Sequence, residues 1–126
     1  LQMGKSVKVG GRRIAASTVV GPPRKGLKIS YAIDTRPCDR VVQLAMGSDL
    51  LVHDGTFGAD AADRAREYGH STVVEAARIA KRSRCRNLAL THTSAIYDDP
   101  SQLLREAKKV FPRAFVAEDL QSMELP

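Results

Sequence analysis

The sequence predicts an α/β fold, and three observations carry that prediction. Short apolar runs at 50–52, 88–90 and 114–117 are apolar on both faces, which is typical of strands buried inside a sheet. Stretches with apolar residues at helical spacing separate these runs. An alternating run at 27–33 adds a half-buried strand in front of them. We therefore expect a mixed sheet with about three helices.

The first twenty residues predict a β-hairpin. Residues 6–9 and 12–20 read as two strands that flank a Gly10-Gly11 turn. Gly21-Pro22-Pro23 closes this unit, and the strand at 27–33 follows.

The first helix is expected directly after that strand. Pro37 suits a first helical turn, Gly47 suits the stop, and Val41, Leu44 and Ala45 share one face. The order is thus strand, helix, strand.

Two further helices have clear start signals. Thr72 and Glu75 have capping-box spacing, and one stripe follows them, made of Val73, Ala76, Ala77 and Ala80. Asp99 and Pro100 open the last helix, which should end near Lys108-Lys109 before Pro112. A strand at 114–117 and a second extended run at 123–125 complete the chain. The segment 58–69 fits either a short helix or a mobile loop.

Strands that are apolar on both faces require cover on both sides. Three helices suffice for one face, and nothing else in the sequence supplies cover for the other. We therefore expect an exposed apolar face, and with it a homodimer or a missing partner segment.

Composition bounds the class of protein. The chain has 126 residues, enough for one domain, and its 20 basic against 14 acidic residues give a net charge of +6, which favours a polyanionic partner. The basic run 81–86 follows a helix and is better explained as its solvated end.

Cys38 and Cys85 are expected to be reduced thiols. No apolar stretch is long enough to cross a membrane and residues 1–5 lack the features of a secretion signal, so we expect a cytoplasmic protein with no membrane partner.

Three of the predicted strands are followed by aspartate or histidine, the residue types that commonly bind metals. Asp34 follows the first, His53-Asp54 the second and His92 the third, and the carboxyl ends of strands are where α/β folds hold their sites. Each residue also has a simpler reading: Asp34 as a helix cap, and His92 as a hydrogen-bonded core or surface histidine. His70 lies in a loop at a helix start, where it is either a plain loop residue or an acid–base group.

Four segments in order resemble ribonuclease Z, the tRNA 3′-end processing endonuclease family of the metallo-β-lactamase superfamily. They are Pro23-Arg24-Lys25-Gly26, Asp34-Thr35-Arg36-Pro37-Cys38, His70-Ser71-Thr72 and Thr91-His92. The resemblance implies that residues 1–126 are the C-terminal half of such a domain, that is, half of an αβ/βα sandwich.

The resemblance also implies roles for particular residues. Asp34 would bridge two zinc ions and His92 would bind one of them; His70 would assist cleavage of precursor tRNA, oriented by a carboxylate. The family has a glutamate for that purpose where this chain has Asp54, one methylene shorter. His53 matches a family histidine that is not a ligand. The residues implied in substrate binding are Arg24, Lys25, Ser71, Thr72 and Tyr97, with a solvated turn as the alternative for the loop that holds Arg24 and Lys25. An arginine that usually precedes this tyrosine is replaced by Ile96.

Most of the family's metal ligands come from an upstream H-x-H-x-D-H cluster that this chain lacks. It has three histidines in total and begins at Leu1. We therefore expect a C-terminal fragment that binds zinc weakly or not at all and is inactive alone. The alternatives are a split enzyme, a non-catalytic RNA-binding or dimerisation module, and, less favoured, another hydrolase of the superfamily.

Overall fold

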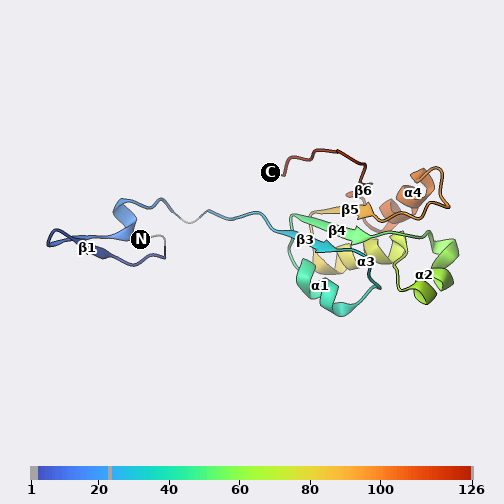
Figure 1. The fold of residues 1–126 in the computed structure, drawn as a ribbon, viewed down its shortest axis with the longest axis horizontal. Helices are drawn as coiled ribbons and strands as arrows, with labels where there is room; N and C mark the ends of the chain where they lie inside the picture. The colour runs from blue at the N-terminus through green and yellow to red at the C-terminus, as the bar shows by residue number, and fades with distance from the viewer. Residues whose placement is uncertain (1–2, 23, 126) are drawn as a thin grey trace.

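The structure, a computed structural model, describes residues 3–22 and 24–125. A small antiparallel hairpin is followed by a four-stranded sheet with its helices (Figure 1). The elements are β1 (Val7–Val9), β2 (Arg12–Ile14), η1 (Ala16–Thr18), β3 (Ile29–Ala32), α1 (Asp39–Ala45), β4 (Leu50–Asp54), η2 (Ala59–Ala61), α2 (Ala62–Tyr68), α3 (Val73–Ser83), β5 (Asn87–Thr91), α4 (Ser101–Val110) and β6 (Ala114–Val116).

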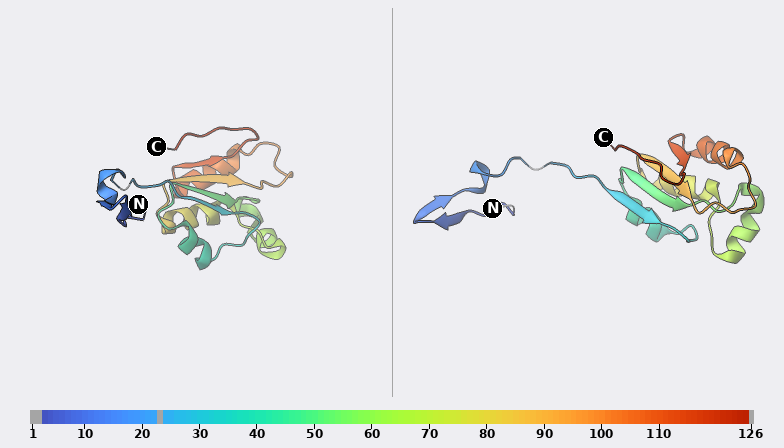
Figure 2. Two further views of the ribbon diagram at one scale, coloured as in Figure 1. Left: turned by 60° about the vertical axis from the view of Figure 1, so that its left-hand side comes forward. Right: turned by 45° about the horizontal axis from the view of Figure 1, so that its top comes forward.

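The four main strands are all parallel and lie in the order β3-β4-β5-β6. Each connection moves one position in the same direction and contains a helix. Because such crossovers are right-handed, successive helices must fall on the same face. Figures 1 and 2 show α1 and α3 together on one side of the sheet, and α4 contacts both α3 and β6.

The core lies between these helices and the sheet. Leu51, Leu88 and Leu90 point toward the helices and are fully buried against the α3 stripe. The predicted stripe is confirmed, since Val73, Ala76, Ala77 and Ala80 are all buried. Small alanines let α3 approach the sheet closely.

The other face of the sheet is open. Alternation along the strands places Tyr31, Val52, Ala89 and Phe115 in one row across it. Ile29 is 60% exposed and Tyr31 is 70% exposed, and no helix of the described chain packs over them. The exposed apolar face predicted from the sequence is therefore present at β3, whereas Val52 and Phe115 are half-buried and Ala89 is buried.

Helix boundaries follow the expected signals with some differences. Thr72 and Glu75 form the predicted capping box. α1 begins at Asp39 rather than in the turn at Pro37, and Val42, not Leu44, joins Val41 and Ala45 in the core. The segment 58–69 contains η2 and α2, so the described residues form four α-helices where about three were expected.

Two strand predictions were too long or wrong. The second hairpin strand ends at Ile14 rather than at residue 20, because the chain turns at Ala15, where the Thr18 hydroxyl donates to the Ala15 carbonyl at 2.6 Å. Residues 123–125 form no strand. The main sheet is not mixed, because all four of its strands are parallel. The antiparallel strands are β1 and β2, which form a separate hairpin.

The hairpin stands away from the sheet (Figure 1). Residues 19–22 and 24–28, which connect it to β3, form no helix or strand. No helix in the described part of the chain has the length and apolarity needed to cross a bilayer.

Candidate active site

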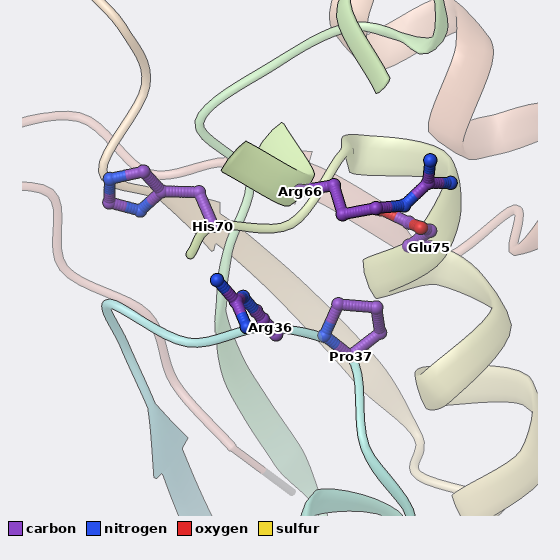
Figure 3. Close-up of a pocket in the computed structure, with 5 residues that line it drawn as sticks. All are labelled: Arg36, Pro37, Arg66, His70 and Glu75. Atoms are coloured by element: carbon purple, nitrogen blue, oxygen red, sulfur yellow. The ribbon is translucent and has the colours of Figure 1, made fainter. Parts of the chain in front are cut away.

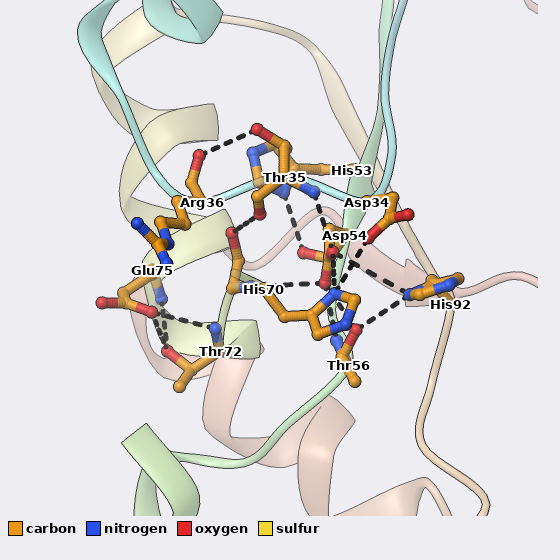
Figure 4. A network of polar contacts seen from close by, with 11 residues as sticks. Asp34, Thr35, Arg36, His53, Asp54, Thr56, His70, Thr72, Glu75 and His92 are labelled. Atoms are coloured by element: carbon orange, nitrogen blue, oxygen red, sulfur yellow. Dashed lines mark hydrogen bonds and ion pairs between the residues drawn. The ribbon is translucent and has the colours of Figure 1, made fainter. Parts of the chain in front are cut away.

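The candidate site lies at the carboxyl edge of the parallel sheet, where β3, β4 and β5 end side by side (Figure 4). Asp34 follows β3, Asp54 ends β4, and His92 follows β5. Asp34 and His92 both have left-handed backbones, with φ of 54° and 62°. Non-glycine residues rarely adopt this conformation, and it is concentrated at functional sites. Two of the predicted ligands thus carry local backbone strain.

Asp54 is the buried hub of the site. One carboxylate oxygen accepts from the Thr56 hydroxyl at 2.7 Å, the Thr56 amide at 3.0 Å and the Ser71 amide at 3.4 Å. The other accepts from the Thr35 amide at 3.1 Å and from His70 Nδ1 at 3.0 Å. Burial opposes ionisation, but the hydrogen bonds from His70, Thr56 and Thr35 outweigh it and lower the pKa of Asp54. Asp54 is therefore a fixed carboxylate.

His70 is positioned between two helices. Gly69 ends α2 with φ of 84°, and Thr72 begins α3, so the loop that carries His70 is held at both ends. A carboxylate only accepts, so Nδ1 donates to Asp54 and Nε2 is left as the functional nitrogen. Asp34 Oδ1 lies 3.4 Å from the same Nδ1. The sequence left open whether the shorter Asp54 side chain could reach His70, and the structure places the two within hydrogen-bonding distance.

The orientation of His92 follows from the hydrogen bonds of Thr56. The Thr56 hydroxyl has one proton, which it donates to the Asp54 carboxylate. The contact of 3.0 Å between Thr56 Oγ1 and His92 Nδ1 must then be donated by the histidine. This leaves His92 Nε2 with a free lone pair, the usual arrangement of a histidine that ligates a metal.

Asp34, Asp54, His70 and His92 each present a ligand atom, and these atoms lie within 4.8 Å of one another. Their environments differ. Asp54 already accepts five hydrogen bonds, close to the capacity of a carboxylate, whereas the Asp34 side chain is 71% exposed. The donor set thus fits a metal held by Asp34 and His92, with Asp54 and His70 orienting each other beside it. An aspartate cap is not the role of Asp34, because the N-cap of α1 is Cys38 and has no side-chain bond.

His53 is fully buried and has a structural environment. Its Nδ1 donates to the Asp54 carbonyl at 2.8 Å, while Nε2 has no partner among the described residues. Burial lowers the pKa of His53, which keeps the ring neutral. The structural reading preferred from the sequence agrees with this position.

The expected substrate residues are not all near this cluster. The pKa of Asp49, just before β4, is lowered mainly by the hydrogen bond that its carboxylate accepts from the Lys28 amide, with smaller contributions from the charges of Arg86 and Lys25. Lys25 therefore lies near the amino end of the sheet, and Arg24 precedes it in the segment that enters β3. Pro23 of the same predicted loop lies outside the described residues. Ser71 is buried and donates to the Thr35 carbonyl at 2.6 Å, and Thr72 caps α3. Tyr97 lines a groove with His92, and its hydroxyl accepts from the Gly58 amide at 2.9 Å.

Sequence reasoning missed two supporting residues. Thr56 links Asp54 to His92, and Phe57 packs edge-on against His70 with ring centroids 6.1 Å apart. Their position directly after the β4 aspartate was the available signal. Gly55, between Asp54 and Thr56, lies close to Leu90 and Val73, since an added Cβ would lie 3.1 Å from a Leu90 methyl.

Comparisons with known proteins agree on one family. No family model matches the chain. It is 45% identical over 127 residues to "Ribonuclease Z" of Methanosarcina acetivorans, covering 100% of this chain and 42% of that protein. It is 46% identical over 129 residues to "Ribonuclease Z" of Haloferax volcanii, covering 100% and 41% respectively. The chain therefore spans about two fifths of the length of the curated relatives it matches.

Solved structures give the same result for the fold. The metallo-β-lactamase fold protein YhfI of Bacillus subtilis is 31% identical with a TM-score of 0.66, covering 71% of this chain and 36% of that one. The short form of human tRNase Z is 34% identical with a TM-score of 0.55, covering 70% of this chain and 29% of that one.

Proposed function

The chain is a homologue of ribonuclease Z with a metallo-β-lactamase-type fold, as its motifs predicted, and from this premise we propose that it is the C-terminal half, residues 1–126, of an endonuclease that removes the 3′ trailer from precursor tRNA. The observation that carries the proposal is the Asp54–His70 pair, 3.0 Å apart with Asp54 fully buried, beside the Asp34 and His92 ligand atoms.

The pair is arranged for proton transfer to a leaving oxygen. The ionised Asp54 fixes Nδ1–H of His70 and stabilises the positive charge of a protonated ring. Phe57 against the ring and Asp54 below it restrict its orientation. A phosphodiester placed at this edge of the sheet can thus receive a proton from His70 Nε2 as the ribose 3′-oxygen departs.

Asp34 and His92 Nε2 are the residues that would hold zinc here. When bound, zinc supplies an activated water and neutralises charge on the phosphate. Two protein ligands fall short of the three or four typical of zinc sites, so the remaining ligands would come from a segment outside this chain. We infer weak metal binding and no cleavage by the chain alone.

The open face of the sheet supports the same inference. Ile29 and Tyr31 are left exposed by the one-sided helix cover. A second α/β layer on this face would complete a four-layer sandwich, and the curated relatives have the additional length to supply it.

The decisive experiment combines this chain with the remaining N-terminal part of the Methanosarcina acetivorans relative and measures cleavage of precursor tRNA with added zinc. We expect chelator-sensitive cleavage from the mixture and none from either part. His70→Ala in this chain should lower the rate by about 10²- to 10⁴-fold. Cleavage by the 126-residue chain alone would overturn the fragment proposal.

One observation favours a second candidate, a non-catalytic RNA-binding module. All charged side chains among the described residues 3–22 and 24–28 are basic: Lys5, Lys8, Arg12, Arg13, Arg24, Lys25 and Lys28. Salt-dependent binding of tRNA without cleavage, even after the N-terminal part is added, would select this candidate.

A further inference from the structure

A second pocket lies directly beside His70. Its cavity volume is about 210 Å³, and it is lined by Arg36, Pro37, Arg66, His70 and Glu75. Figure 3 shows Arg36 and Pro37 in the segment after β3, Arg66 on α2 and Glu75 on α3, with His70 in the loop between the two helices and its ring pointing away from Arg66 and Glu75. A water molecule occupies roughly 30 Å³ in the liquid, so the pocket can hold a phosphate group with several waters.

Among the described residues, the Arg36 guanidinium has no ion-pair partner. Within residues 3–22 and 24–125, no carboxylate forms an ion pair with it, and its guanidinium makes no hydrogen bond. Within the part of the chain that the structure describes, this cation thus lines a concave site without an internal ion pair.

Arg66 is also available. Its ion pair with Asp63 is 3.2 Å long, with both side chains largely exposed at 77% and 99%. Exposed pairs of this kind contribute little, so the guanidinium can turn toward a ligand at small cost.

The one acid in the pocket is already engaged. A Glu75 oxygen accepts from the amide and the hydroxyl of Thr72 at 2.9 Å in the capping box. Two arginines against one occupied carboxylate leave the lining positive even with His70 neutral.

The backbone next to Arg36 is held in place. The neighbouring Thr35 amide donates to Asp54 and the Thr35 carbonyl accepts from Ser71, so this backbone is tied to the His70 loop. A Cβ on Gly69 would lie 3.7 Å from Arg36 Nε, so the guanidinium rests against the residue that precedes His70.

We propose that the Arg36–Arg66 pocket binds an RNA phosphodiester that neighbours the one cleaved beside His70. This inference rests on the proposed nuclease function. Guanidinium groups recognise phosphate oxygens with paired, charge-assisted hydrogen bonds. Such contacts position a nucleic acid strand without reading its bases. The pocket would thus set the register of the strand relative to His70.

The test uses the 126-residue chain, short single-stranded RNA, and Arg36→Gln with Arg105→Gln as a control of equal charge change on α4. We expect Arg36→Gln to weaken RNA binding about threefold to tenfold and to reduce the magnitude of the salt slope by about 0.7, the value for one phosphate contact on a single strand. Arg105→Gln should leave both nearly unchanged. The NMR signal of the Arg36 Nε–H should shift on adding RNA.

Inorganic phosphate is the second probe. If RNA shifts the Arg36 signal, and inorganic phosphate shifts it only at a far higher concentration, the result supports a strand-binding pocket. Saturation by free phosphate at or below the RNA concentration would instead identify a site for small anions and overturn the proposal. Equal effects of Arg36→Gln and Arg105→Gln would also overturn it, since general charge would then explain the binding.

The same variants separate this proposal from the proposed function. In the mixture with the N-terminal part of the relative, Arg36→Gln should raise KM for precursor tRNA more than it lowers kcat. If the wild-type mixture cleaves and Arg36→Gln does not change KM, the pocket proposal fails and the nuclease stands. If the wild-type mixture does not cleave, the function fails, and the binding results still decide whether the pocket holds phosphate.

Discussion

The two faces of the parallel sheet differ in how they are covered, although both are built from the same strands. One is sealed by α1, α3 and α4, and its leucines are fully buried. The other presents Ile29 and Tyr31 to solvent. The difference comes from topology rather than from side-chain chemistry, because right-handed crossovers that advance in one direction place every helix on one side. The stability of the chain should therefore depend on one face, and its assembly on the other.

The largest expected effect comes from the sealed face. Leu51→Ala should lower the free energy of unfolding by about 2–5 kcal/mol, because a fully buried leucine leaves a cavity against α3. Ile29→Ala removes a comparable side chain from the open face and should cost less than about 1 kcal/mol. Urea unfolding of both variants measures the contrast. Equal losses would mean that the two faces are equally packed.

Asp54 tests the edge where the covered layer meets the site. Asp54→Asn keeps the size of the side chain but places an NH₂ among groups that donate to it, so we expect a loss of about 1–3 kcal/mol. Asp34→Asn is the matched control, since that side chain is exposed and should change stability by less than about 0.5 kcal/mol. Thermal unfolding near neutral pH compares them, and similar losses would contradict the buried role of Asp54.

The pH dependence of that difference has a definite sign. The pKa of Asp54 is lower in the folded chain than its unfolded value of about 3.9. Its charge therefore stabilises the fold above the unfolded pKa, and this contribution is lost as pH falls through the folded pKa. The gap between the wild type and Asp54→Asn should shrink below about pH 4. Asp49 and Asp99, whose pKa values are also lowered, are present in both proteins and cancel. A gap independent of pH would show that packing, not charge, sets the effect.

A smaller effect is expected at the start of α3. Thr72→Ala removes the hydroxyl that accepts from the Glu75 amide and should cost about 1 kcal/mol. Thr72→Ser keeps the capping oxygen and should cost much less. Because the cap also fixes the loop that carries His70, hydrogen exchange at Ser71 should increase in the alanine variant. Unchanged hydrogen exchange at Ser71 would show that the cap does not fix the loop that carries His70.

These residues also show what the sequence could predict. The capping box, the α3 stripe and the strand-end positions of Asp34, Asp54 and His92 depend on local spacing, and the structure has each of them. The roles of Thr56 and Arg36 depend on segments distant in sequence: Thr56 lies 36 residues from its partner His92, and Arg36 lies against Gly69. Periodicity carries no information on such contacts. The premature end of β2 was missed for a local reason, since the Thr18 hydroxyl bond closes a turn within an apparently β-forming run.

The smallest effect on stability should accompany a large effect on assembly. Tyr31→Glu places a charge on the open face, where the side chain is 70% exposed, and should change the stability of the chain alone by less than about 1 kcal/mol. It should abolish pairing with the N-terminal part of a relative, because a buried charge without a partner is costly. Tyr68→Glu on α2 is the control, since Tyr68 is 60% exposed and belongs to a helix rather than to a strand of the sheet.

Analytical ultracentrifugation of each variant, alone and with the N-terminal part, measures both outcomes. If wild type and Tyr68→Glu form a mixed dimer and Tyr31→Glu does not, the open face is the docking surface for the second half. If the wild-type chain instead pairs with itself and Tyr31→Glu breaks that pairing, the face serves a homodimer. If Tyr31→Glu pairs as tightly as Tyr68→Glu, the open face is neither the docking surface for the second half nor a homodimer interface. The contrast between the two faces would then describe packing alone, and the site would need another route to its remaining ligands.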